Sequence, residues 1–236
     1  MDRYTTLIQP QQLAPHLADP RWAVFDCRFD LADPGAGRRA YLAGHVPGAQ
    51  YAHLDDDLAG PITQTSGRHP LPDPRAFAER LGRWGVGNDS QVVVYDGATG
   101  GIAARLWWML RWLGHRDVAV LDGGFAAWQR AQLPVETETR ARPAARFSGS
   151  PRDAAWIGSA DLAECLARQD IALVDARASD RFAGRNETID PVAGHVPGAR
   201  NHPFATNLDA DNRFLPALEL HRRWSATLGG APAAQA

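Results

Sequence analysis

Three short apolar runs mark the first half of the chain. Residues 22–26 (WAVFD), 91–96 (QVVVYD) and 118–122 (VAVLD) are almost continuously apolar, and each ends on Asp. Runs of this length, rich in β-branched residues and bounded by polar positions, are typical of strands buried on both faces. The pattern therefore predicts three buried strands in this half of the chain.

Segments of helical periodicity accompany these strands. Residues 101–115 carry apolar side chains at helical spacing with a Gly near the end, which predicts a helix with a C-cap. Residues 73–85 open with Asp and Pro, which suit an N-cap and a first helical position, and residues 124–133 predict another helix. This alternation predicts an α/β fold whose mostly parallel sheet is flanked by helices on both faces. Chemistry in such folds lies beyond the carboxyl ends of the strands.

The second half repeats motifs of the first half in the same order. Residues 43–50 read AGHVPGAQ and residues 193–200 read AGHVPGAR, so seven of eight positions match at an offset of 150. Upstream, WAVFDCR at 22–28 parallels IALVDAR at 171–177 at an offset of 149. Two matches at nearly the same offset predict two homologous domains.

The predicted elements of the second copy also follow the order of the first. Helical patterns at 157–167 and 216–229 enclose an apolar run at 171–175, which predicts a strand.

Composition separates the two copies. Residues 136–153 are rich in Pro, Arg, Ser and Thr without a sustained period, which is typical of a linker. We therefore predict a first domain at 1–135, a linker at 136–153, and an incomplete second domain at 154–236.

Charge and cysteine content narrow the function classes. A net charge of −2 gives no reason to expect nucleic acid or an anionic membrane as partner. The apolar runs are too short to cross a bilayer, and the N-terminus lacks the layout of a signal peptide. Two cysteines cannot form a disulfide framework, so we expect a reducing cytoplasm. No spacing typical of metal ligands is present.

Several longer motifs carry a resemblance to a known family. They are GHVPGA twice, SGRHPLPDPRAF, VVVYDGATGGIAARLWWMLRWLGH, VLDGGFAAW and DRFAGRNETIDPVAGHVPGA. In this order they resemble the tandem-domain rhodanese family, the thiosulfate and 3-mercaptopyruvate sulfurtransferases. The resemblance runs from about residue 7 to residue 224 and implies two rhodanese-like domains.

The resemblance also implies a reaction. A cysteine at the start of a loop after the central strand of the second domain takes sulfur from a small anionic donor and becomes a persulfide. A thiol or cyanide then removes the sulfur, and a thioredoxin-like reductant is a further expected partner. Loop N–H groups and a helix dipole lower the pKa of such a cysteine. The resemblance implies no cofactor.

Position 96 locates the expected nucleophile. The first-domain loop begins at Asp96, and an offset of 150 places its counterpart near position 246, outside residues 1–236. We therefore expect no catalytic cysteine within these residues, and an inactive chain. The resemblance implies that the first domain, with Asp96 in place of the cysteine, is an inactive copy. Its carboxylate is interpreted either as a general base or, as we favour, as a cap of the following helix.

Two arginines are the expected donor-binding residues. Arg181 precedes an aromatic residue and lies shortly before the second GHVPGA, where the resemblance implies contact with the anionic donor. The fixed fork of a guanidinium matches a carboxylate or sulfonate. Arg185 is the second candidate. The alternative for each is an ordinary surface arginine in a loop.

The remaining candidates are interpreted as structural. His45 and His195 occur in both GHVPGA copies, although the first domain is predicted to be inactive, so they are expected to hold turns. Cys27 follows a strand, but no glycine-rich loop follows it. Cys165 lies on the apolar face of a predicted helix and is expected in the core.

Two rival functions remain. One is a non-catalytic rhodanese-fold binding module or relic, and the other is a rhodanese-fold phosphatase, which would need a longer loop after the cysteine. The sequence does not choose between thiosulfate and 3-mercaptopyruvate as donor.

Overall fold

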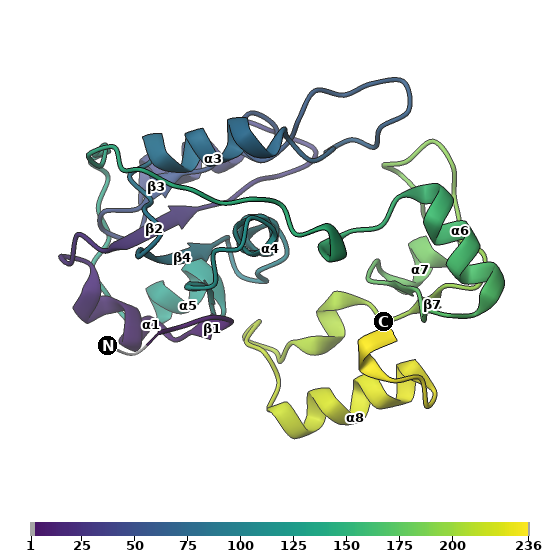
Figure 1. Ribbon diagram of the computed structural model, residues 1–236. Helices are drawn as coiled ribbons and strands as arrows, with labels where there is room; N and C mark the ends of the chain where they lie inside the picture. The colour runs from purple at the N-terminus through teal and green to yellow at the C-terminus, as the bar shows by residue number, and fades with distance from the viewer. Residues whose placement is uncertain (1–2, 236) are drawn as a thin grey trace. The chain divides into compact units, whose positions relative to one another are not determined.

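The computed structural model describes residues 3–235, which form two compact units that divide between Asp153 and Ala154 (Figure 1). Each unit is described separately, as unit 1 and unit 2. Unit 1 confirms the predicted α/β class, with a parallel sheet flanked by helices on both faces.

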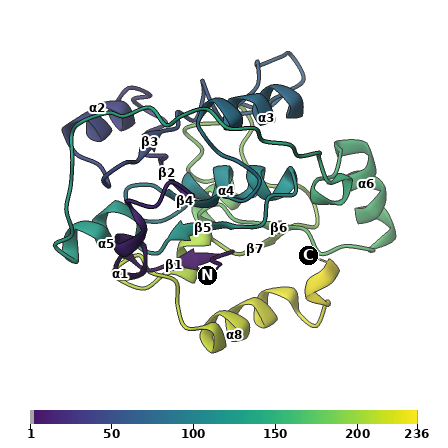
Figure 2. The ribbon, with the colours of Figure 1, turned by 60° about the vertical axis from the view of Figure 1, so that its left-hand side comes forward.

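The sheet of unit 1 contains five parallel strands in the order β1-β5-β4-β2-β3. Figure 2 shows them in this order from β3 at the top to β1 at the bottom. The three strands predicted from the apolar runs are its three inner strands. The strands are β1 (Leu7–Ile8), β2 (Trp22–Asp26), β3 (Gln50–Tyr51), β4 (Gln91–Tyr95) and β5 (Val118–Leu121).

Helices cover both faces because side chains alternate along each strand. On one face Val24 and Val93 belong to a core cluster with Trp128 of α5, and α1 contributes to the same cluster. Phe25 points to the other face, where its ring centroid lies 5.0 Å from that of Trp84 at the end of α3. The helices are α1 (Pro10–Leu13), α2 (Ala36–Ala43), α3 (Pro74–Arg83), α4 (Ala103–Trp112) and α5 (Gly124–Arg130).

The predicted helix signals act as expected. The side chain of Asp73 accepts hydrogen bonds from the backbone N–H groups of Arg75 at 3.0 Å and Ala76 at 2.9 Å, so Asp73 is the N-cap of α3. Just after α4, Gly114 has a φ of 87°, a left-handed conformation that ends the helix.

The segment 136–153, predicted as a linker, lies along unit 1. Arg142 donates hydrogen bonds to the carbonyl oxygens of Trp22 at 2.7 Å and Pro20 at 2.6 Å. Further along, the N–H of Ala145 donates to Gly82 O at 2.9 Å. A polar composition therefore does not make this segment a flexible linker, because its hydrogen bonds to backbone carbonyls hold it against unit 1.

Unit 2 contains a two-stranded parallel sheet, β6-β7. The run 171–175 forms a strand only at its last two residues, so the predicted strand is shortened. Strand pairing within the described residues reaches it from one side alone, which leaves its first residues without a ladder. The elements are α6 (Ser159–Arg168), β6 (Val174–Asp175), α7 (Ser179–Phe182), β7 (Arg200–Asn201) and α8 (Ala217–Leu228).

The two units share an Asp–Arg clamp, which confirms the repeat in three dimensions. In unit 1, Arg28 binds both oxygens of Asp26 at 2.5–3.0 Å and the carbonyl of the first Gly of GHVPGA at 2.7 Å. In unit 2, Arg177 binds Asp175 at 2.6–3.1 Å and the carbonyl of the equivalent Gly at 2.6 Å. The clamp ties the end of a strand to the following turn in each unit.

Both GHVPGA motifs form the predicted type II turn. The N–H of the final Ala donates to the Val carbonyl at 2.9 Å in unit 1 and 3.0 Å in unit 2. The intervening residues Gly48 and Gly198 have φ values of 75° and 88°, which glycine adopts without strain.

The histidine of each motif holds the turn, as expected. Nδ1 of His45 lies 2.8 Å from Tyr41 O, and the two rings are stacked with centroids 4.0 Å apart. Nδ1 of His195 lies 2.8 Å from Phe182 O, with ring centroids 3.6 Å apart. The same contact recurs in both units, which supports a structural role for the two histidines.

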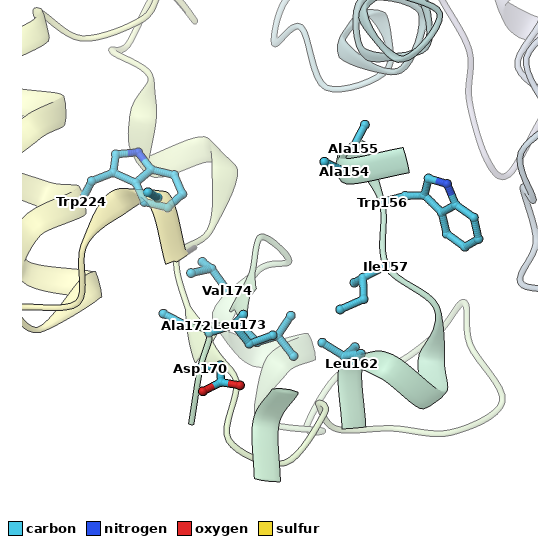
Figure 3. Close-up of a pocket in the computed structure, with 12 residues that line it drawn as sticks. Ala154, Ala155, Trp156, Ile157, Leu162, Asp170, Ala172, Leu173, Val174 and Trp224 are labelled. Carbon is cyan, nitrogen blue, oxygen red and sulfur yellow. The ribbon is translucent and has the colours of Figure 1, made fainter. Parts of the chain in front are cut away.

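Unit 2 has a small core and an open apolar pocket. Among residues 154–234, only Ala172 and Leu228 are buried apolar residues. A pocket of about 580 Å³ lies beside β6, and in Figure 3 side chains from α6, from the segment before it, from the β6 strand and from α8 surround it. Its larger apolar lining residues are Trp156, Ile157, Leu162, Ile171, Leu173, Val174 and Trp224.

Hydrogen exchange should distinguish the two sheets. In a dilute monomer of residues 1–236, we expect the amides of Val93 and Val94 to exchange at least ~100-fold more slowly than that of Val174. β4 is paired on both edges and buried, whereas β6 is paired only with β7 among the described residues. Measurement by NMR at several protein concentrations checks this. Equal protection in the two strands would show that unit 2 closes its sheet in another way.

Candidate functional site

The loop after β4 is lined by backbone N–H groups that converge on one carboxylate. One oxygen of Asp96 accepts from Ala98 at 3.1 Å and Gly100 at 2.9 Å. The other accepts from Ile102 at 2.9 Å and Ala103 at 3.2 Å, at the start of α4. Asp96 is 4% exposed. Four donors and a helix N-terminus stabilise a negative charge here.

This geometry supports the capping interpretation of Asp96. Its two oxygens accept hydrogen bonds from four N–H groups of the loop and of the start of α4, which is the arrangement expected of a helix cap. The loop is thus an anion cradle, meaning residues 96–103 with their inward N–H groups. In unit 1 the carboxylate of Asp96 occupies this cradle.

Gly123 and Gly124, at the start of α5, allow the cradle to form. Gly124 has a φ of 56°, and a Cβ at this position would lie 2.7 Å from Asp96 O and 2.8 Å from Ala98 N. The N–H of Phe125 donates to Asp96 O at 2.9 Å. A side chain at 124 would therefore push the cradle away from α5.

Cys27 is not placed to act as a nucleophile. It is fully buried, and burial raises the pKa of its thiol well above the usual range, with the nearby carboxylates of Asp26 and Asp96 adding to the effect. A thiol in this setting stays protonated at neutral pH.

The expectation for Cys165 is wrong. Its side chain is half-buried on α6, a helix with no buried residue, and Nη2 of Arg168 lies 3.6 Å from its sulfur. The apolar face of α6 has too little core to pack against within the described part of unit 2, so helical periodicity overstated the burial of Cys165.

Arg181 lies in a cluster of charged side chains in unit 2. Its guanidinium donates to Glu187 at 2.9–3.1 Å and to Asp190 at 3.0 Å. Arg177 lies 3.5 Å from the same Glu187 while it clamps Asp175. The cluster therefore consists of Asp175, Arg177, Arg181, Glu187 and Asp190.

Glu187 is the most firmly held member of the cluster. The N–H groups of Ile189 and Asp190 both donate to its Oε1 at 2.9 Å. These backbone hydrogen bonds, together with that from Arg181, lower the pKa of Glu187 to about 2. Residues 187–190 thus form a tight loop around one carboxylate, a feature that the sequence did not reveal.

Arg185 lies apart from this cluster. It is solvent-exposed, and its backbone N–H donates to Asp180 O at 3.0 Å. The structure therefore places Arg181 among partners and Arg185 on the open surface.

A His–Asp pair in unit 1 was also not predicted from the sequence. Nε2 of His69 lies 2.9 Å from Oδ1 of Asp55, and the side chain of His69 is 20% exposed. The edge of its ring faces Phe29 with centroids 6.4 Å apart. A carboxylate that orients an accessible imidazole is a pair suited to proton transfer. The SGRH motif contains the histidine, but its partner lies 14 residues upstream.

Metal-ligand clusters and membrane-spanning helices are both lacking among residues 3–235. No group of three or more His, Cys, Asp or Glu side chains is placed to hold a metal ion within that range. In the same range, no helix is long and apolar enough to cross a bilayer.

Comparisons with known proteins identify relatives along the whole chain. The rhodanese-like domain matches residues 9–131. A probable 3-mercaptopyruvate sulfurtransferase of Pseudomonas aeruginosa is 50% identical over 229 residues, which cover 96% of this chain and 80% of that protein. Thiosulfate sulfurtransferase of Bos taurus is 33% identical over 234 residues, covering 94% and 77%. The crystal structure of the 3-mercaptopyruvate sulfotransferase SseA from Escherichia coli matches with a TM-score of 0.82 at 30% identity, covering 97% of this chain and 85% of that one.

A parallel sheet with an anion cradle after its central strand, followed by a second homologous unit, defines the class of tandem-domain sulfurtransferases. The matches extend over both units, and so the resemblance drawn from the motifs is confirmed. The chain belongs to the rhodanese family.

Proposed function

We propose that the protein moves sulfur from 3-mercaptopyruvate or thiosulfate to a thiol or cyanide through a cysteine persulfide. The cysteine occupies the position of Asp96 in the second copy, near position 246 in the numbering of this chain. A thioredoxin-like reductant is one of the proposed thiol acceptors, and the reducing cytoplasm is the proposed compartment. Two free cysteines support that compartment.

The observation that carries this proposal is the anion cradle of unit 1. Four N–H groups there hold a negative charge at the start of α4. The same loop in the second copy would hold a thiolate and keep its pKa low. The thiolate attacks the sulfane sulfur of thiosulfate and releases sulfite, or takes the sulfur of 3-mercaptopyruvate and releases pyruvate. Cyanide then attacks the outer persulfide sulfur, and thiocyanate leaves as the thiolate is restored.

Arg181 is the proposed contact for the anionic group of the donor, and Arg185 is a second one. Both proposals follow from the resemblance, and the structure supports Arg181 in one respect, because Glu187 and Asp190 hold its guanidinium in place. A guanidinium held by the buried carboxylate of Glu187 and the partly exposed carboxylate of Asp190 keeps a fixed direction, which is what a donor site needs.

A chimera tests the function. Residues 1–236 would be joined to the part of the Pseudomonas aeruginosa relative that follows the matched region, and sulfur transfer to cyanide measured with each donor. We expect turnover, and a loss of about 10–100-fold in kcat/KM in Arg181→Ala, the range for losing a charge-assisted contact. Replacing the supplied cysteine by Ser should abolish turnover. A folded chimera that uses neither donor would refute the proposal.

A further inference from the structure

The guanidinium of Arg181 is already occupied by acidic side chains of its own unit. Nε and Nη2 donate to the two oxygens of Glu187, and Nη2 also donates to Asp190. These two nitrogens form the fork that grips a carboxylate or sulfonate in a bidentate manner. A donor anion therefore reaches Arg181 through Nη1 alone, unless Glu187 gives way.

Glu187 is built into this place by the backbone. Its side chain is 3% exposed, and two N–H groups of its own loop hold it. A passing surface ion pair would be exposed and weakly held. Glu187 is instead a fixed negative charge beside the proposed donor contact.

Glu187 places a negative charge in direct contact with the guanidinium of Arg181, at 2.9 Å from Nη2. Coulomb energy is proportional to the charge of the approaching ligand, so this fixed negative charge opposes a dianion twice as strongly as a monoanion.

We propose that Glu187 is a positioning residue that sets donor specificity: it holds the fork of Arg181 and disfavours dianions such as thiosulfate relative to a monoanionic carboxylate such as 3-mercaptopyruvate. This inference rests on the proposed function, in which Arg181 contacts the donor. Glu187 acts through Arg181 and through its charge.

Anion binding to the 236-residue chain tests this role without turnover. The probes are pyruvate, a monoanionic carboxylate, and thiosulfate, a dianion, each titrated by NMR at fixed ionic strength. Glu187→Gln keeps an oxygen that accepts the loop N–H groups but removes the charge. We expect pyruvate to bind about 5-fold and thiosulfate about 25-fold tighter, because the change in free energy scales with ligand charge. Damage to the loop would weaken the binding of both anions. The expected tighter binding is therefore distinguishable from a structural effect of the substitution.

Matched variants separate the possible outcomes. Glu219→Gln changes a carboxylate of α8 that pairs with Arg222 and Arg223, and it should leave both affinities unchanged. Asp190→Asn should increase both affinities by less than Glu187→Gln does, again with the larger increase for the dianion. If Glu187→Gln fails to fold, Asp190→Asn tests the proposal in its place.

Three results overturn a claim. If Arg181→Ala binds both anions as well as the wild type, the donor contact of the proposed function fails. If Arg181→Ala loses binding but neither Glu187→Gln nor Asp190→Asn gains any, the donor contact stands and the role of Glu187 is wrong. Equal gains for both anions, or a gain in Glu219→Gln, would refute the proposed selectivity.

Discussion

A protein consisting of residues 1–236 is expected to transfer no sulfur from 3-mercaptopyruvate or thiosulfate to cyanide above the rate without protein. Its two cysteines both lie outside the anion cradle. Cys27 is fully buried with a raised thiol pKa, and Cys165 is half-buried on α6. Without a stabilised thiolate the covalent route is closed, which removes the whole catalytic effect rather than part of it.

Thiol labelling provides the control for this expectation. Iodoacetamide should modify Cys165 in the native protein and leave Cys27 unmodified, whereas both should react in denaturant. Turnover that disappears in Cys27→Ser would mean that the buried thiol becomes accessible and reactive. Turnover that disappears in Cys165→Ser would assign the reaction to α6 instead.

The second large effect concerns stability. We expect Asp96→Ala to lower the free energy of unfolding of unit 1 by about 3–5 kcal/mol, because it leaves four N–H groups without their acceptor. Those of Gly100 and Ala103 are in buried hydrogen bonds, where water cannot replace the carboxylate. The melting temperature should fall by roughly 10 °C.

Asp73→Ala is a matched control for this change. It removes a carboxylate that caps α3 through two exposed hydrogen bonds, and it should cost only about 1 kcal/mol. Denaturant unfolding of both variants, followed by circular dichroism, measures the difference. Equal losses would show that Asp96 is an ordinary helix cap and that the loop around it is not an anion cradle.

Local patterns predicted the strands and helices of unit 1 well, because the apolar segments are also buried in the folded unit. The runs at 22–26 and 91–96 are apolar throughout and form inner strands covered on both faces. The same reasoning overstated the run at 171–175, where strand structure is limited to its last two residues. The apolar pattern of a segment predicts which of its residues favour burial. Burial also requires another part of the protein that packs against them.

Contacts between residues that are distant in the sequence could not be predicted from the sequence. Arg181 was identified through the family resemblance, but its pairing with Glu187 depends on a loop held by backbone N–H groups. The pairing of His69 with Asp55 closes a loop of 14 residues, for which no local signal exists. The attachment of segment 136–153 depends on hydrogen bonds from Arg142 to carbonyl groups more than 100 residues upstream.

The Asp–Arg clamp occurs in both units, so the two halves of the chain can be compared with each other. Both units contain the GHVPGA motif and the clamp, so contacts that recur in the two units can be compared within one chain. The clamp and the turn histidine are present in both units, which indicates that their role is structural. The ring that stacks on that histidine has diverged from Tyr41, whose hydroxyl donates to Ala49 O, to Phe182. Divergence between the copies, rather than identity, is therefore where specialisation of either unit should be sought.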